Sequence, residues 1–267
     1  VLDHTYDFVD YISMHQYYGN QAEDTPNFLA NTMDMDRFIE NITATCDYIQ
    51  AKKRSKKKIN ISFDEWNVWF HAFPENEKAV KWQEGPSFNE DIYTFEDALL
   101  VGGMLISLLR HADRVKIACQ AQLVNVIAPI MTDNEGGAFR QSIYYPFLHA
   151  SRYGRGTALT PVISSTCHDT SRHGEVTDID AAAVYNEEKE EVTIFAVNRC
   201  AGQDIPFEAD LNSFEGYRVI EYLAMENDDM KAVNSLTGEK VTPYSKKEYQ
   251  MEDGIFTTIM KSCSWNV

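Results

Sequence analysis

Paired cysteines are absent from this sequence of 267 residues. The five cysteines are far apart and include no CxxC pair: Cys46, Cys119, Cys167, Cys200 and Cys263. An odd, scattered set indicates buried, reduced thiols and argues against a disulfide framework or a zinc site. We therefore expect no metal, and we also expect no cofactor.

Long hydrophobic runs are also absent. No apolar segment approaches the roughly 18 residues that a membrane span requires, and no signal peptide is present. We expect no membrane partner. Because the chain begins with Val1 rather than Met, we expect it to be part of a longer protein, so that any targeting signal of the parent would not be visible in this sequence. A cytoplasmic location in a bacterium is our expectation, with secretion left open.

Basic charge is scarce. The chain has 24 lysines and arginines against 41 aspartates and glutamates, which gives a formal net charge of −17. So acidic a surface repels phosphate groups and argues against nucleic acid as a partner, whereas a neutral sugar meets no such penalty. A basic run at residues 52–58 follows a predicted helix, where cations complement the helix dipole.

The first part of the chain shows three buried strand patterns, each followed by a helix pattern. We predict strands at 8–15, 59–63 and 114–119, and helices at 35–53, 94–109 and 141–153. The second helix opens with a capping-box pattern and contains Gly102-Gly103, which we expect to allow close packing against the sheet. About 50 residues separate successive strand ends, enough for right-handed strand–helix units, so the layer is predicted to be parallel.

Beyond residue 157 apolar and polar residues alternate, with turn clusters between the alternating segments. We predict strands at 181–184, 191–197, 217–223 and 254–260. This pattern is typical of an antiparallel β-sandwich. We therefore predict two domains, residues 1–157 and residues 158–267, in a fold class of α/β plus all-β.

The most informative segment is residues 61–69, ISFDEWNVW, which delivers Glu65 at the polar end of a buried strand. Enzymes with parallel sheets keep their chemistry at this end of the strands. Aromatic rings can cover the apolar face of a sugar while a carboxylate attacks its anomeric carbon. The alternative interpretation is a solvated acid beside two core tryptophans.

Four motifs carry a resemblance to a known family: YISMHQYYGN (residues 11–20), SFDEWNVW (62–69), AQLVNVIAP (121–129) and the closing SWNV (264–267). Together they resemble the α-L-arabinofuranosidases of glycoside hydrolase family 51. The resemblance implies a (β/α)8 TIM barrel followed by a jelly-roll-like sandwich, with this chain supplying barrel strands six to eight and the sandwich. It further implies a homo-oligomer that removes terminal arabinofuranosyl residues from arabinan- or arabinoxylan-type glycans with retention of configuration.

The resemblance also implies roles for five residues. Glu65 matches the catalytic nucleophile of the family, and Tyr17 matches a tyrosine that positions it. His15 matches a histidine lining the same pocket, Trp69 an aromatic wall, and Gln122 a glutamine that hydrogen-bonds sugar hydroxyls. By residue type alone, His15 and Trp69 would be core residues and Gln122 unremarkable.

Two neighbours of these residues receive no catalytic role. Asp64 adjoins Glu65 and is expected to face the opposite side of an extended strand, so we assign it a structural role. His71 follows Trp69 and stays unassigned. A metallohydrolase with His15, His71 and Glu65 as ligands is a remote alternative, because no helix carries HExxH spacing.

A retaining glycosidase needs a second carboxylic acid, the general acid/base, about 5–5.5 Å from the nucleophile. The family supplies it from an Asn-Glu pair at an earlier strand end. Here Asn89-Glu90 lies in a polar loop and Asn186-Glu187 in the predicted sandwich, so neither qualifies. We therefore expect the acid/base upstream of residue 1, an inactive isolated chain, and an unpaired sheet edge that favours self-association.

Two other functions are compatible with the sequence. One is a related retaining glycosidase, such as an endoglucanase or xylosidase on a similar barrel. The other is a non-catalytic carbohydrate-binding or assembly module with residues 159–267 as its working part, although no solvent-facing aromatic strip is evident in those residues.

Overall fold

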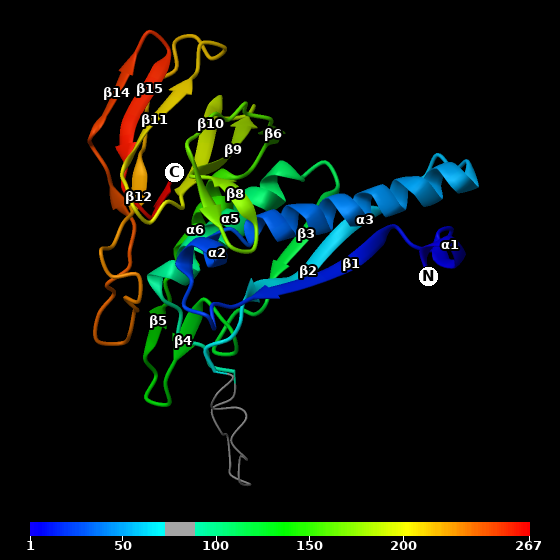
Figure 1. Ribbon diagram of the computed structural model, residues 1–267, viewed down its shortest axis with the longest axis horizontal. Coiled ribbons are helices and arrows are strands. Elements are labelled where there is room, and N and C mark those ends of the chain that lie inside the picture. Colours follow the sequence, from blue (N-terminus) through cyan, green and yellow to red (C-terminus); the bar gives the residue numbers. More distant parts are fainter. Residues whose placement is uncertain (73–88) are drawn as a thin grey trace.

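The computed structural model describes residues 1–72 and 89–267. Its first layer is a parallel sheet of three strands, in the order β1 (Tyr11–Tyr18), β2 (Asn60–Val68), β3 (Val115–Gln120). Helices α3 (Thr32–Lys53) and α5 (Phe95–Arg110) connect these strands in sequence and pack on one face of the sheet (Figure 1). The predicted parallel α/β layer is confirmed.

Burial and capping explain both long helices. Helix α3 turns an apolar stripe toward the sheet: Met35, Ile39, Cys46 and Ile49. Helix α5 begins with the predicted capping box, in which Thr94 accepts from the Asp97 N–H and the Asp97 carboxylate accepts from the Thr94 N–H. Among the described residues, no helix is long and apolar enough to cross a membrane.

The first strand lies further along the chain than predicted. The prediction of residues 8–15 is wrong at both ends, because Phe8 is 86% exposed and the ladder with β2 runs from Tyr11 to Tyr18. Hydrophobic character alone set the predicted start, whereas pairing with β2 sets the observed one. As a result His15 and Tyr17 both lie inside the strand, on the same side of it.

Helix α5 is the central element of the molecule, and its glycines allow this. A Cβ at Gly102 would lie 2.6 Å from the Trp265 ring, and a Cβ at Gly103 would lie 2.6 Å from Thr32. The glycines do allow close packing, but the partner predicted for them is wrong: they face α3 and a strand of the second part of the chain in place of the parallel sheet. One continuous hydrophobic core extends from Phe63 in β2 through α5 to Trp265.

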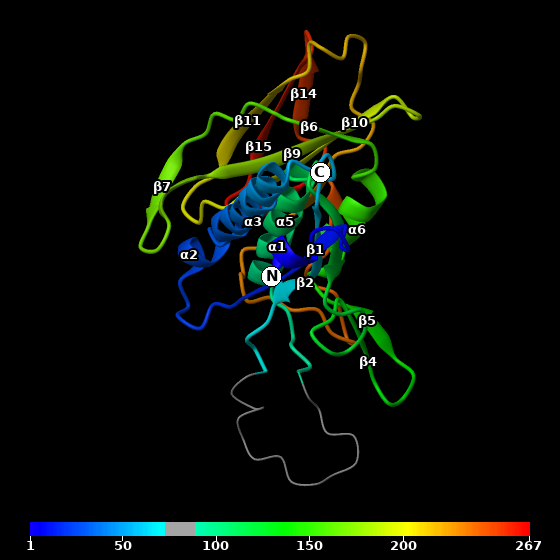
Figure 2. The same ribbon diagram turned by 90° about the vertical axis from the view of Figure 1, so that its right-hand side faces the viewer.

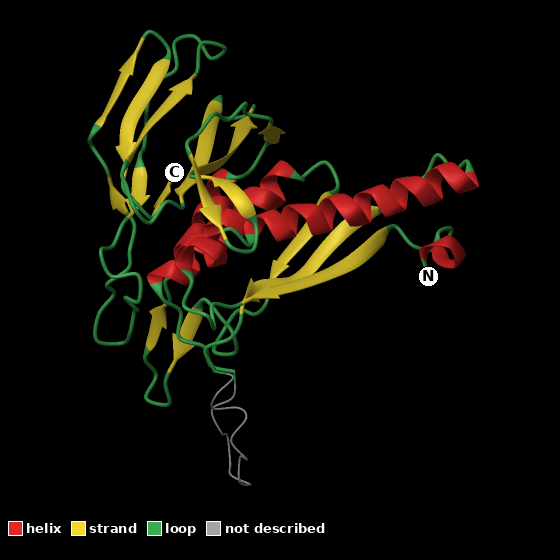
Figure 3. Ribbon diagram, in the orientation of Figure 1, coloured by secondary structure: helices red, strands yellow, loops and turns green. Residues whose placement is uncertain are grey.

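The second part is built on two larger antiparallel sheets and one antiparallel hairpin (Figures 2 and 3). The larger has the order β13 (Tyr244–Ser245), β12 (Leu223–Met225), β16 (Ser264–Asn266), β10 (Glu191–Asn198), β9 (Ile179–Asn186), β6 (Thr157–Leu159). The smaller has the order β11 (Ile205–Asp210), β15 (Ile255–Met260), β14 (Tyr249–Glu252). A small apolar cluster joins the two sheets: Ile179, Ala181, Ala196, Ile205 and Met260.

Short elements complete the described chain. The helices are α1 (Leu2–Thr5), α2 (Thr25–Leu29) and α6 (Tyr144–Tyr153), and the hairpins are β4 (Ile130–Thr132) with β5 (Ala138–Arg140) and β7 (Cys167–Thr170) with β8 (Gly174–Thr177). Helix α6 ends before Gly154, close to the predicted end of the third helix.

One predicted strand is largely wrong. Within residues 217–223 only the last residue, Leu223, belongs to a strand, because the pairing of β12 with β13 and β16 starts there. Burial does not follow the alternation that suggested a strand, because Ile220 and Tyr222 are two residues apart and differ in exposure. Tyr222 is buried and its hydroxyl donates to Asn266, whereas Ile220 is 70% exposed.

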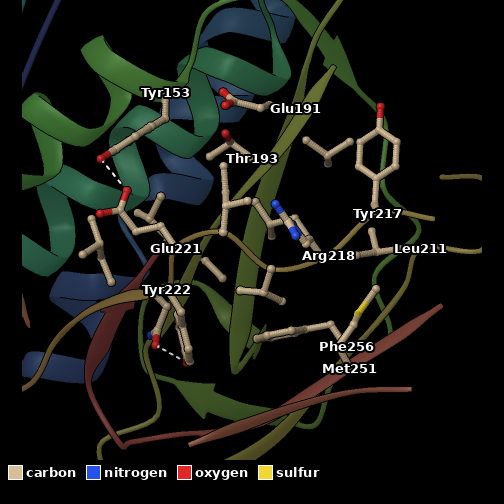
Figure 4. A pocket seen from close by; sticks show the side chains of 18 of the residues that line it. Tyr153, Glu191, Thr193, Leu211, Tyr217, Arg218, Glu221, Tyr222, Met251 and Phe256 are labelled. Carbon is tan, nitrogen blue, oxygen red and sulfur yellow. Dashed lines mark hydrogen bonds between the residues drawn. The ribbon is translucent and has the colours of Figure 1, made fainter. Parts of the chain in front are cut away.

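A cavity of about 340 Å³ lies between the two sheets of the second part (Figure 4). Its walls include Ile194, Phe207 and Phe256, and charged residues such as Glu191 and Arg218 also line it. All its lining residues lie at or beyond position 153, so the cavity is separate from the strand ends that carry Glu65.

Candidate functional site

A bulge in β2 sets the direction of its acidic side chains. Phe63 and Trp66 are both fully buried, although strict alternation would turn residues three apart to opposite faces. The pairing of β2 with β1 and with β3 shifts register at this same place. An extra residue in one strand causes such a shift. Asp64 and Glu65 therefore share one face of the sheet, so the expectation that Asp64 faces the other way is wrong.

Glu65 is held by Tyr17 from the neighbouring strand. The Tyr17 hydroxyl donates a hydrogen bond of 2.8 Å to Glu65 Oε2. Burial and then this hydrogen bond raise the pKa of the Tyr17 phenol above its ordinary value of 10, so it remains a donor at neutral pH. The ring of Tyr17 packs edge-on against Trp69, with centroids 5.2 Å apart.

His15 lies opposite Glu65 in the β1–β2 ladder. Its Nδ1 is 3.5 Å from Glu65 Oε2, and its Nε2 is 3.6 Å from Asp64 Oδ1. Ser13 Oγ donates to Asp64 Oδ1 at 2.8 Å and lies 3.3 Å from His15 Nε2. The side chains of His15, Asp64 and Glu65 are between 41% and 48% exposed, so this face is accessible to a ligand.

Trp69 follows β2 and its segment is fixed by backbone hydrogen bonds. Its N–H donates to Tyr18 O at 2.9 Å. The buried Asp91 carboxylate accepts from the next three backbone N–H groups, those of Phe70, His71 and Ala72. Burial raises the pKa of Asp91, and these bonds oppose the rise. His71 itself contacts the buried Asp97, with Nε2 and Oδ2 2.8 Å apart.

Gln122 lies just beyond β3, in a loop that Asn67 secures. The Gln122 side chain is exposed. The fully buried Asn67 donates through Nδ2 to Ala121 O at 2.6 Å and to Ile127 O at 2.7 Å. Our reading of the sequence missed Asn67, although its position two residues after Glu65 on the same strand was a usable signal.

The described residues thus bring His15, Tyr17, Glu65 and Trp69 into one contact network, with Gln122 on the adjoining loop. Chemically, the network presents a carboxylate beside a phenol donor and an imidazole, with the Trp69 ring packed against the phenol. This combination suits a carboxylate nucleophile acting on a sugar ring.

The sequence was also compared with known families. The model for the C-terminal domain of α-L-arabinofuranosidases matches residues 64–264. The chain belongs to the α-L-arabinofuranosidase family. The resemblance inferred from the motifs is confirmed.

Similar members of this family come from several bacteria. The chain is 57% identical to an intracellular exo-α-(1→5)-L-arabinofuranosidase of Acetivibrio thermocellus, over 100% of this chain and 54% of that protein. It is 52% identical to a Bacillus subtilis protein described as intracellular exo-α-(1→5)-L-arabinofuranosidase 1, over 100% of this chain and 53% of that protein. The chain therefore spans about half the length of the curated relatives it matches.

A solved structure shows the same fold. A family 51 α-L-arabinofuranosidase from Bifidobacterium longum superimposes with a TM-score of 0.92 at 35% identity, covering 100% of this chain and 54% of that one. Helices and sheets are mixed in this family as they are here.

The other residues that the sequence suggested as metal ligands or as the acid/base lie outside the network around Glu65. His71 is bonded to Asp97, so it does not join His15 and Glu65 in one ligand set. Within residues 1–72 and 89–267, no cluster of three or more His, Cys, Asp or Glu residues is arranged to hold a metal ion. Asn186 ends β9 and Glu187 lies in the turn after it, so that pair lies in the antiparallel part, as predicted.

Proposed function

We propose that this chain is the C-terminal part of a retaining α-L-arabinofuranosidase in which Glu65 is the nucleophile. The observation that supports this most is the Tyr17–Glu65 hydrogen bond of 2.8 Å beside the His15 imidazole. Relatives described as exo-α-(1→5)-L-arabinofuranosidases suggest a terminal α-L-arabinofuranosyl residue as the group removed.

In the proposed reaction the Glu65 carboxylate attacks the anomeric carbon and forms a glycosyl-enzyme, which water then hydrolyses. Tyr17 keeps one carboxylate oxygen in place while the other attacks. His15 and Trp69 line the pocket, and Gln122 hydrogen-bonds the sugar hydroxyls. The acid/base that protonates the leaving oxygen belongs to the part of the whole enzyme outside this chain.

The same proposal extends to the fold. Strands β1, β2 and β3 would be strands six to eight of a (β/α)8 barrel, with the domain division after residue 157. Within the described chain, β1 and β3 each pair only with β2, which is the arrangement that further barrel strands would complete. By analogy with the relatives described as intracellular, we place the whole enzyme inside a bacterial cell. It would act there as a homo-oligomer on arabinofuranosyl-containing glycans.

The test compares the 267-residue chain with the longer parent protein on an aryl α-L-arabinofuranoside. The parent should release the aryl group, its Glu65→Gln variant should lose turnover, and the 267-residue chain should be inactive and self-associated. Glu188→Gln is a matched control, since Glu188 is exposed in the turn between β9 and β10. A parent whose turnover survives Glu65→Gln would disprove the nucleophile assignment, and Glu65-dependent turnover by the short chain would disprove the need for an upstream acid.

A second candidate function is carbohydrate binding by the antiparallel part, and the cavity between its sheets is the observation that favours it. Tyr217 and Arg218 line this cavity from one segment (Figure 4). Under this alternative, Tyr217→Ala would abolish binding of arabino-oligosaccharides to the parent. Binding that survives Tyr217→Ala, together with turnover that is lost in Glu65→Gln, favours the nucleophile site.

A further inference from the structure

Asp64 is the acidic residue of β2 that the proposed reaction leaves unused. An extended strand would turn Asp64 and Glu65 to opposite faces, where Asp64 could not influence the site. The bulge between Phe63 and Trp66 removes that separation and turns both carboxylates toward β1. Such bulges commonly re-aim side chains next to active sites.

Two contacts connect Asp64 to the nucleophile. Asp64 Oδ1 lies 3.6 Å from His15 Nε2, and Ser13 Oγ bridges them at 2.8 Å and 3.3 Å. The opposite nitrogen of the same ring, Nδ1, lies 3.5 Å from Glu65 Oε2. The ring therefore stands between two carboxylates, with one nitrogen turned toward each.

We propose that Asp64, together with Ser13, is a positioning residue that holds the His15 ring so that its Nδ1 faces Glu65. This inference rests on the proposed function, because it assigns Asp64 a role through the nucleophile. An imidazole flipped about its long axis would present carbon to Glu65, and the acceptor on the Nε2 side opposes that flip. Asp64 acts through His15 and touches neither the sugar nor the reacting atoms.

The geometry distinguishes this role from that of a stray surface acid. A solvated aspartate at a strand end has no need of a partner, yet Asp64 accepts a hydrogen bond from Ser13 on the neighbouring strand. The shared face also depends on the bulge, since without it Glu65 would lie on the side of Phe63, away from Asp64 and His15. The charged groups that the structure brings to the His15 ring are Asp64 and Glu65.

The test uses the full-length parent enzyme with Asp64→Asn, which keeps the shape and removes the charge. We expect kcat on an aryl α-L-arabinofuranoside to fall about 10- to 100-fold, as displaced catalytic groups do, with KM changing less than about threefold. The rate at which a mechanism-based furanoside inactivator labels Glu65 should fall in parallel. Asp113→Asn is the matched control, because Asp113 is exposed in the turn before β3.

Ser13 provides a second route if Asp64→Asn fails to fold. Ser13→Ala removes the bridging hydroxyl and leaves both carboxylates. We expect kcat to fall about 3- to 10-fold, which is less than the full loss of a charge-assisted hydrogen bond would cause. Ser13→Thr keeps the hydroxyl on an exposed position and should restore the wild-type rate. If Ser13 had only a structural role, Ser13→Ala would lower the melting temperature. We expect Ser13→Ala and Ser13→Thr to melt at the same temperature, so that only kcat distinguishes them.

Two results would overturn the inference. One is a kcat within twofold of wild type for both Asp64→Asn and Ser13→Ala. The other is a raised KM at unchanged kcat for Asp64→Asn, because that would place Asp64 in contact with the sugar. Failure of the proposed function is distinguishable from both results. If the proposed function is wrong, the parent has no arabinofuranosidase activity, or its activity is unchanged by Glu65→Gln. If only the inference about Asp64 is wrong, the activity remains and still depends on Glu65.

Discussion

Tyr17→Phe is the most direct test of the hydrogen bond that holds the candidate nucleophile. The substitution removes only the hydroxyl that donates to Glu65 Oε2 at 2.8 Å. The aromatic ring remains, so its edge contact with Trp69, at 5.2 Å between centroids, is preserved. The change therefore isolates the hydrogen bond from the packing.

The expected magnitude follows from the charge and exposure of the acceptor. A hydrogen bond to a charged group contributes about 1.5–3 kcal/mol, and the low end applies because the Glu65 side chain is 46% exposed. At about 1.4 kcal/mol for each tenfold change in rate, kcat/KM should fall roughly tenfold. Because the pKa of Tyr17 is raised above 10, ionisation of this phenol should cause no loss of activity below pH 10.

The assay is hydrolysis of an aryl α-L-arabinofuranoside by the longer parent enzyme. Tyr48→Phe is the control, since Tyr48 is 66% exposed on α3 and should give wild-type kinetics. Tyr17→Ala should lose more activity than Tyr17→Phe, because it also removes the contact with Trp69. A kcat/KM for Tyr17→Phe within twofold of wild type would refute the reasoning.

Three further outcomes are expected in stability and binding. Gly102→Ala places a methyl group 2.6 Å from the Trp265 ring, so it should lower the melting temperature and cost about 1–3 kcal/mol of the free energy of unfolding. In the control Gly202→Ala the new methyl group meets nothing within 4 Å, so stability should not change. Asn67→Ala removes the side-chain donor to Ala121 O and leaves Ile127 O with the Gln122 N–H, so unfolding should be easier by about 1–3 kcal/mol in urea titrations and KM should rise as the Gln122 loop loosens. Burial lowers the pKa of His149 from 6.5 to about 4, so the imidazole takes up a proton more readily in the unfolded chain than in the folded one. The free energy of unfolding should therefore fall by about 3 kcal/mol as the pH drops from 6.5 to about 4. Urea titrations of His149→Gln over this range should show a smaller fall.

Period and capping were sufficient to predict the parallel layer with its helices and three strands of the second part, β9, β10 and β15. The capping box at Thr94 and the buried strand around Phe63 both follow from local sequence, because capping residues and side-chain burial have fixed spacings in each kind of element. The strand predicted at 217–223 shows the limit of this reasoning. Strand structure requires a paired neighbour as well as a suitable pattern, and β13 and β16 provide one only from Leu223 onward.

The candidate site was predictable to the extent that it followed from motifs. Glu65 and Tyr17 were identified by family motifs, and the structure brings them within hydrogen-bonding distance. The shared face of Asp64 and Glu65 was not predictable, because one extra residue in β2 re-aims Glu65 and every later side chain and leaves no mark in the hydrophobic pattern before it. Asn67 was missed because its partners are backbone carbonyls more than 50 positions away in the sequence.

The central claim is that Glu65 forms the covalent bond to the sugar, and mass spectrometry of the inactivated parent enzyme tests it most directly. After treatment with a mechanism-based arabinofuranoside inactivator, fragmentation of the peptide that contains residues 61–69 should locate one sugar adduct on Glu65. An adduct on Asp64, or on any residue outside this peptide, would contradict the account.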